Sequence, residues 1–172
     1  NLIEKLFIIP DGICTALFPT LAMLYQVSRQ DAEKLFKRFN AYMLLIGLPV
    51  AVGTTLIAGP IITLIFGAGY KAAIPVLQIL IWWFLLLSIN WLQMWSLNAV
   101  HQERKTVKVS FVSTTAYIVS NLLLIPYFGA LGAAAASVVS SVLTIMLFNR
   151  LVHKHIVAGI YLNRIYLKII LA

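Results

Sequence analysis

Charged residues are scarce in this sequence, and their scarcity excludes an ordinary soluble domain. Of the 172 residues, 10% are charged and 62% are hydrophobic, and the mean hydropathy is +0.96. Soluble globular domains have about a quarter of their residues charged. Residues 39–70 and 72–100 contain no Asp, Glu, Lys or Arg, and only Lys71 separates them. Each run exceeds the roughly 20 apolar residues that cross about 30 Å of hydrocarbon, so we predict an integral membrane protein.

Cysteine is nearly absent too. The single cysteine, Cys14, lies in an apolar run, which excludes an internal disulfide framework and predicts inert packing. The start of the chain lacks the basic, apolar and small-residue pattern of a signal peptide, so we expect none. The chain begins at Asn1 and ends at Ala172 within an apolar segment. We therefore expect a piece of a longer polytopic protein.

The excess of basic residues has a membrane explanation. A formal net charge of +8 would favour nucleic-acid binding in a soluble chain. Here the basic residues gather in three connectors, 28–38, 101–108 and 150–164, while the connectors 67–71 and 126–129 hold only Lys71. The positive-inside rule places the three basic connectors in the cytoplasm. We therefore predict a multi-pass protein of the cytoplasmic membrane, with membrane lipids as partners and no nucleic acid.

The apolar stretches between the connectors predict an all-α, polytopic bundle of transmembrane helices. The predicted spans lie near residues 2–26, 39–66, 72–100, 109–125 and 130–149, and an incomplete sixth span starts at 165–172. Pro10 and Pro19 should interrupt the first span, which would then face protein or water rather than lipid. Pro49 predicts a kink in the second span.

Two local patterns bear on how the helices begin and pack. From Gly132 onward, small residues recur every four positions, which predicts a face buried against another helix. Ser28 and Asp31 have capping-box spacing, so a short helix could begin there. The preferred interpretation of residues 28–38 is nevertheless a solvated loop that ends in a basic anchor.

Patterns of catalytic or metal-ligating residues are missing. The connectors 67–71 and 126–129 are too short for a catalytic domain, and no nucleophile–base pair, carboxylate pair or HExxH motif occurs. His153 and His155 lack a third ligand nearby. Residues 67–69 resemble half of a dinucleotide fingerprint, but they follow no strand and lack the third glycine. We predict that the protein is not an enzyme and holds neither a metal nor a cofactor.

Several motifs together resemble one transporter family. They are Ala-Leu-Phe-Pro-Thr-Leu-Ala at 16–22, Gly-Leu-Pro at 47–49, Ile-Phe-Gly-Ala-Gly-Tyr at 65–70, Ala-Ile-Pro-Val-Leu-Gln-Ile-Leu at 73–80 and Pro-Tyr-Phe-Gly-Ala-Leu-Gly-Ala-Ala at 126–134. Over nearly the whole chain, this order resembles the polysaccharide-exporter branch of the multidrug/oligosaccharidyl-lipid/polysaccharide flippase superfamily.

The resemblance implies two bundles of helices around a central cavity. This chain would be part of the C-terminal bundle, with the N-terminal bundle of the same protein as its partner. Relatives move lipid-linked oligosaccharides, typically on a polyprenyl diphosphate, from the cytoplasmic to the outer leaflet by alternating access. Two alternatives stay open: a drug or cation antiporter of the same superfamily, and a non-transporting scaffold or glycan-polymerising enzyme. The short outer connectors argue against a polymerising enzyme.

Candidate substrate and ion contacts are few, because polar side chains within the spans are rare. Asp11 lies about 10 Å into its span. It could be a cation or proton site, or it could be an acid that stays hydrated near the outer surface or has a structural partner. The side chains that could contact sugars are Asn90, Gln93, Asn98, Asn121 and Trp95, although hydrogen bonds between helices and ordinary packing explain them as well. Trp95 shares a helical face with Trp91. A diphosphate needs cations, for which the candidates at the cytoplasmic mouth are Arg29, Arg38, Arg104 and Lys105.

Overall fold

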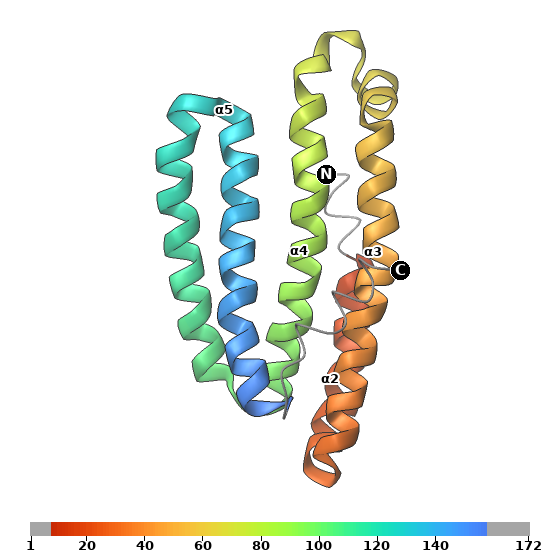
Figure 1. The fold of residues 1–172 in the computed structure, drawn as a ribbon, viewed down its shortest axis with the longest axis vertical. Helices are drawn as coiled ribbons and strands as arrows, with labels where there is room; N and C mark the ends of the chain where they lie inside the picture. Colours follow the sequence, from red (N-terminus) through yellow and green to blue (C-terminus); the bar gives the residue numbers. More distant parts are fainter. Residues whose placement is uncertain (1–7, 158–172) are drawn as a thin grey trace, which may run out of the picture.

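The computed structural model describes residues 8–157, and every regular element in that part of the chain is a helix. The elements are α2 (Ile8–Val27), α3 (Arg29–Phe66), the short 3₁₀ helix η1 (Ala68–Ala73), α4 (Ile74–Ala99) and α5 (Glu103–His155). The long helices run up and down beside one another (Figure 1). Three stretches are long and apolar enough to cross a membrane, namely Arg29–Phe66, Gly69–Ala99 and Glu103–His155. The all-α class is confirmed, whereas the number of crossings and the two-bundle architecture stay predictions.

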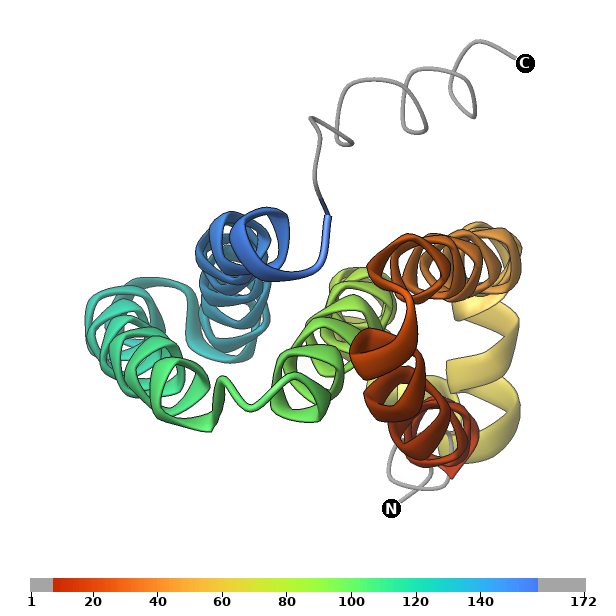
Figure 2. The same cartoon turned by 90° about the horizontal axis from the view of Figure 1, so that it is seen from below.

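α5 consists of two antiparallel limbs joined by a reversal at one glycine. Gly129 has φ 55° and ψ −130°, a conformation that residues with a side chain rarely adopt. The chain turns back there, and the two limbs lie side by side (Figures 1 and 2). The reversal falls at the last residue of the predicted connector 126–129, while Pro126 lies inside the first limb.

α4 is the central helix of the described chain. It contacts α2, α3 and α5, and it lies between the α2–α3 pair and the two limbs of α5 (Figure 2). One cluster of buried side chains joins all four helices; it includes Leu21 of α2, Phe36 of α3, Leu92 of α4 and Phe148 of α5. Cys14 is fully buried in the same cluster. In a bilayer such a cluster stabilises the bundle mainly through van der Waals contact between helices.

The predicted interruption of the first span is wrong over the described residues. α2 is continuous from Ile8 to Val27 with Pro19 inside it, and residues 2–7 lie outside the described part. α3 likewise continues through Pro49 and Pro60. A proline removes one backbone donor, which neighbouring helices and hydroxyl side chains can offset within a membrane. The kink at Pro49 stays a prediction.

The predicted solvated loop at 28–38 is also wrong, because α3 begins at Arg29. Ser28 is extended (φ −151°, ψ 105°), and its hydroxyl accepts a hydrogen bond from the Asp31 amide at 3.3 Å. Lys34 Nζ then pairs with Asp31 Oδ1 at 3.0 Å. α3 has 38 residues, about 57 Å at 1.5 Å per residue. This length exceeds the hydrocarbon layer, so the charged first turns extend the helix beyond the predicted span 39–66.

Candidate functional site

Basic residues from separate parts of the chain gather at one end of the bundle. The turn at Ser28, the turn between α4 and α5, and the C-terminal end of α5 all lie at the lower end in Figure 1. We call this the basic end. The turns at Gly67 and Gly129 lie at the opposite end. This is the charge separation that the positive-inside rule requires, while the cytoplasmic position of the basic end stays a prediction.

Of the predicted headgroup residues, Lys105 contacts the imidazole of His155 at the basic end, and the charge of Arg29 acts on the same imidazole. Lys105 Nζ lies 2.8 Å from His155 Nε2, although the two residues are 50 positions apart. Burial lowers the pKa of His155, and the charges of Lys105, Lys154 and Arg29 lower it further. Arg29 is also held over the ring of Tyr25, with Cζ 5.1 Å from the ring centroid.

The other two predicted headgroup residues are not brought into this arrangement by any contact that involves the described residues. Arg38 and Arg104 are both exposed. The sequence singles out His155 only as a possible metal ligand beside His153, and its contact with Lys105 was not predicted. A spacing of 50 residues does not predict that contact. The contact forms because the two limbs of α5 have matching lengths, which the sequence pattern does not specify.

A cleft with polar walls lies between α4 and the two limbs of α5. Its volume is about 270 Å³, and its walls carry six serine and threonine side chains besides Asn90. We call it the polar cleft; its lining residues are Trp83, Leu87, Asn90, Trp91, Met94, Ser110, Ser113, Thr114, Tyr117, Ser140, Ser141, Thr144 and Phe148. Small residues that include Ser140 and Ser141 are buried there, which confirms the predicted small-residue face.

Two buried side chains of the polar cleft have hydrogen-bonding atoms without a partner. Asn90 is 5% exposed, and its Nδ2 donates to the carbonyl of Ser141 at 3.3 Å, but its Oδ1 accepts nothing. Ser113 is 9% exposed, and its Oγ also lacks a partner within the described chain. An unsatisfied polar group costs several kcal/mol in hydrocarbon, so these atoms favour a hydroxylated ligand or water in the cleft.

The remaining predicted sugar contacts make local or interhelical contacts and do not line the polar cleft. Gln93 Nε2 donates to Asn149 Oδ1 at 3.3 Å, and its Oε1 has no partner. The other three are engaged as follows: Asn98 Oδ1 accepts from Thr106 Oγ1 at 2.8 Å, Asn121 Nδ2 donates to the carbonyl of Tyr117 at 2.8 Å, and the Trp95 ring packs edge-on against Phe18 at 5.7 Å. Of Trp91 and Trp95, which share one face of α4, Trp91 lines the cleft and Trp95 does not.

Asp11 lies at the level of apolar residues of α3. It belongs to the first turn of α2 in the described chain, and its side chain is exposed. Ile13, two residues further on, lines a groove together with Tyr42 and Met43 of α3, which are within the predicted span 39–66. No ion pair within residues 8–157 includes Asp11. Its depth therefore agrees with a position inside the hydrocarbon, while its role stays a prediction.

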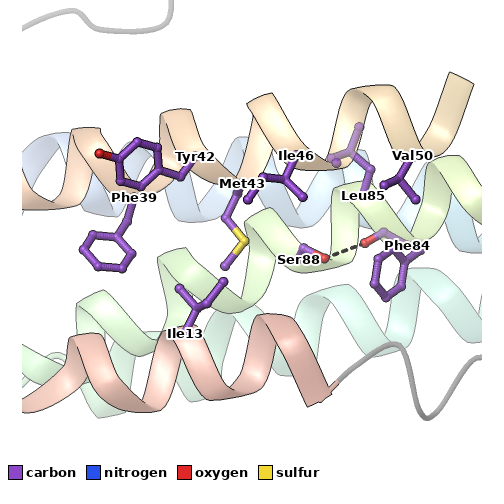
Figure 3. Close-up of a pocket in the computed structure, with 10 residues that line it drawn as sticks. Ile13, Phe39, Tyr42, Met43, Ile46, Val50, Phe84, Leu85 and Ser88 are labelled. Atoms are coloured by element: carbon purple, nitrogen blue, oxygen red, sulfur yellow. Dashed lines mark hydrogen bonds between the residues drawn. The ribbon is translucent and has the colours of Figure 1, made fainter.

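The groove that contains Ile13 has almost purely apolar walls. We call it the apolar groove; it lies between α2, α3 and α4, has a volume of about 350 Å³ and is lined by Ile13, Phe39, Tyr42, Met43, Ile46, Gly47, Val50, Phe84, Leu85 and Ser88 (Figure 3). The Ser88 hydroxyl donates to the carbonyl of Phe84 at 2.9 Å, so it has a partner within its own helix. The apolar groove is therefore suited to hydrocarbon chains.

The long apolar helices, with basic residues gathered at one end, define a helical multi-pass membrane protein. Residues 5–172 match the family described as lipid II flippase MurJ. The chain belongs to this family. The resemblance to flippases of the multidrug/oligosaccharidyl-lipid/polysaccharide superfamily is thereby confirmed.

Curated relatives come from archaea. A "probable flippase AglR" of Haloferax volcanii is 29% identical over 157 residues, which are 88% of this chain and 33% of that protein. An "uncharacterized membrane protein MJ1068" of Methanocaldococcus jannaschii is 29% identical over 132 residues, which are 74% of this chain and 25% of that protein. The chain thus spans between a quarter and a third of the length of these relatives. No solved structure matches it.

Proposed function

We propose that the protein carrying this chain moves lipid-linked glycan precursors between the leaflets of the cytoplasmic membrane by alternating access. The observation that carries the proposal is the match to a flippase family over residues 5–172. The name of the Haloferax volcanii relative agrees with it. In this proposal the chain supplies five crossings and the start of a sixth to a C-terminal bundle, which moves against an N-terminal bundle of the same protein.

In this proposal the polar cleft binds the glycan and the apolar groove contacts the lipid chains. The hydroxylated glycan would use the unpartnered Oδ1 of Asn90 and Oγ of Ser113, beside the aromatic ring of Trp91. Gln93, Asn98, Asn121 and Trp95 would support the cleft through the contacts described above. Hydrocarbon chains of the lipid would contact apolar surfaces such as the apolar groove. A site of this kind binds the sugar through hydrogen bonds that water or lipid cannot replace equally well.

The charged residues would act at the basic end and within the depth of the spans. The basic end would lie in the cytoplasm, where Arg29, Arg38, Arg104 and Lys105 meet the diphosphate of a polyprenyl-diphosphate-linked glycan. Asp11, exposed and at the depth of the spans, would serve as a cation or proton site.

A leaflet-protection assay tests the proposal. The full-length protein is reconstituted with a lipid-linked oligosaccharide on one leaflet, and the fraction that becomes accessible to a membrane-impermeant glycosidase is measured. A gain in accessibility over empty vesicles is expected, and no gain would reject flipping. Uptake of small organic cations into the same vesicles, without glycolipid movement, would favour the antiporter. Glycan elongation by the purified protein would favour the polymerising enzyme.

A further inference from the structure

Cations from three segments meet at the basic end, and no ion pair within residues 8–157 supplies an anion to them. Lys105 from the start of α5 contacts His155 at its end, and the charges of Lys154 and of Arg29, from the start of α3, act on the same imidazole. We call Arg29, Lys105, Lys154 and His155 the cation cluster. Lys154 and His155 are neighbours in sequence, whereas the fold brings the start of α3 and the start of α5 toward them.

The acidic residues near this end are engaged with other partners. The pairs are Asp31 with Lys34, Glu33 with Lys37, and Glu103 with His101. No ion pair in residues 8–157 includes Arg29, Lys105 or Lys154. The positive charges of the cluster therefore repel one another, and an anion that binds between them would reduce this repulsion.

His155 is the member of the cluster that can change its charge near neutral pH. The Lys105 ammonium can donate to Nε2 only while that nitrogen carries no proton. Burial first, and then the neighbouring cations, hold the pKa of His155 below its usual range. An anion between these cations would cancel part of their effect and raise the pKa again, so anion binding and proton uptake are linked.

We propose that the cation cluster binds a phosphate ester, with the phosphate between Arg29, Lys105 and Lys154 and with His155 taking up a proton as the anion enters. The same chemistry can come from the headgroup of an anionic phospholipid or from the diphosphate of a lipid-linked substrate. Basic pockets at helix ends bind phosphate headgroups at the membrane surface in this way. The inference rests on the proposed function only for the second source.

Calorimetric titration of the full-length protein in phosphatidylcholine nanodiscs tests the site. One arm uses short-chain phosphatidylglycerol, whose single charge does not titrate near neutrality, and the other uses farnesyl diphosphate. At least one probe is expected to bind with net proton uptake and about tenfold more tightly at pH 5.5 than at pH 7.5. Lys105→Gln should weaken that binding about tenfold, the size of one charge-assisted hydrogen bond.

Matched variants distinguish the contribution of the His155 imidazole from that of nearby residues outside the cluster. His155→Gln keeps an acceptor for Lys105 but does not titrate, so it should remove the proton uptake that the wild type shows in excess of the probe's own titration. His153→Gln and Lys108→Gln change similar residues on the same helix outside the cluster and should leave affinity and proton uptake unchanged.

The outcomes decide both the site and its ligand. Tighter binding of phosphatidylglycerol identifies a lipid headgroup, and tighter binding of farnesyl diphosphate identifies the substrate diphosphate; either supports the site. Binding of neither probe, equal weakening by Lys108→Gln and Lys105→Gln, or unchanged proton uptake in His155→Gln would overturn it. Because the titration requires no transport, its failure and a failure of the leaflet assay are distinguishable.

Discussion

Two helical hairpins flank α4, and they are built differently. The α2–α3 hairpin turns at Ser28 at the basic end, packs large apolar side chains against α4 and leaves the apolar groove. The α5 hairpin turns at Gly129 at the opposite end, packs small and hydroxylated side chains against α4 and leaves the polar cleft. α4 thus contributes to an apolar groove on one side and to a cleft with hydrogen-bonding side chains on the other.

The difference lies in whether the polar groups of each side have partners. In the apolar groove, the Ser88 hydroxyl donates to a carbonyl of its own helix, so it needs no hydrogen bond from a ligand. In the polar cleft, Asn90 and Ser113 keep buried atoms without partners in the described chain. Because unpartnered polar groups are costly in hydrocarbon, we expect water or a ligand to occupy the polar cleft. The α5 side of α4 is therefore the candidate for substrate contact.

The largest effect is expected at the closest approach within the α5 hairpin. A Cβ added at Gly132 would lie 2.3 Å from the carbonyl oxygen of Leu124 and 2.6 Å from its carbonyl carbon. These are backbone atoms of the opposite limb, which cannot move away cheaply. Gly132→Ala should therefore destabilise the protein by about 1–3 kcal/mol, measured as a lower midpoint of thermal unfolding in detergent.

The α2–α3 hairpin offers the control for this substitution. Gly53 lies within α3, and a Cβ added there would meet no atom within 4 Å. Gly53→Ala should leave the unfolding midpoint unchanged or raise it slightly, because alanine loses less conformational freedom in a helix. Equal losses in the two variants would mean that close packing of the α5 limbs does not hold the hairpin together.

Transport should depend on the polar cleft and not on the apolar groove. Asn90→Leu keeps the approximate side-chain volume but removes both the donor to Ser141 and the unpartnered Oδ1. We expect glycolipid flipping to fall about tenfold, the equivalent of one lost hydrogen bond of about 1.4 kcal/mol, with the unfolding midpoint retained. The leaflet-protection assay measures the first quantity and thermal unfolding the second.

Ser88→Ala is the matched control on the other side of α4. It removes a buried hydroxyl that, within residues 8–157, bonds only to a carbonyl of its own helix, so flipping should be unchanged. If Ser88→Ala and Asn90→Leu reduced flipping alike, the contrast between the two sides of α4 would have no functional meaning.

The helical class and the charge separation could be predicted from the sequence, since uncharged runs and basic connectors determine both. The helical start of α3 was also visible, in the Ser28 cap and in pairs three and four residues apart such as Asp31 with Lys34. The interpretation as a solvated loop that ends in a basic anchor gives these local patterns too little weight. Local pairing outweighs the charged composition, because both acids of the segment pair with a lysine one helical turn away, Asp31 with Lys34 and Glu33 with Lys37.

The partners of individual polar residues could not be predicted in the same way. Asn90 and Gln93 are three residues apart on α4, yet Asn90 lines the polar cleft and Gln93 bonds to Asn149. Which atom each side chain meets depends on the rotation of α4 and on the register of the α5 limbs. The contact of Lys105 with His155 depends on the same register, which the periodicity of a single chain does not specify.

A smaller effect is expected from the cap of the α2–α3 hairpin. Ser28→Ala removes the acceptor of the Asp31 amide at the start of α3. Loss of an N-cap costs about 1 kcal/mol, and here it should appear as faster amide hydrogen exchange in the first turn of α3, with the rest of the bundle unaffected. Ser28→Asp restores an acceptor and should restore protection. Equal exchange in the alanine variant and the wild type would show that the cap contributes nothing.

The smallest effect concerns the charge of Asp31, whose side chain is exposed to solvent. The hydrogen bonds from Lys34 and Ser28, together with the charge of Lys34, hold the pKa of Asp31 below its usual range. The stabilisation is therefore complete above the ordinary aspartate pKa and is lost as the pH falls through the lowered one. Amide protection at the start of α3, corrected for the intrinsic pH dependence of exchange, should decline in acid in the wild type. Asp31→Asn should abolish that decline, because an amide cannot titrate, whereas an identical decline in the variant would assign it to another carboxylate such as Glu33.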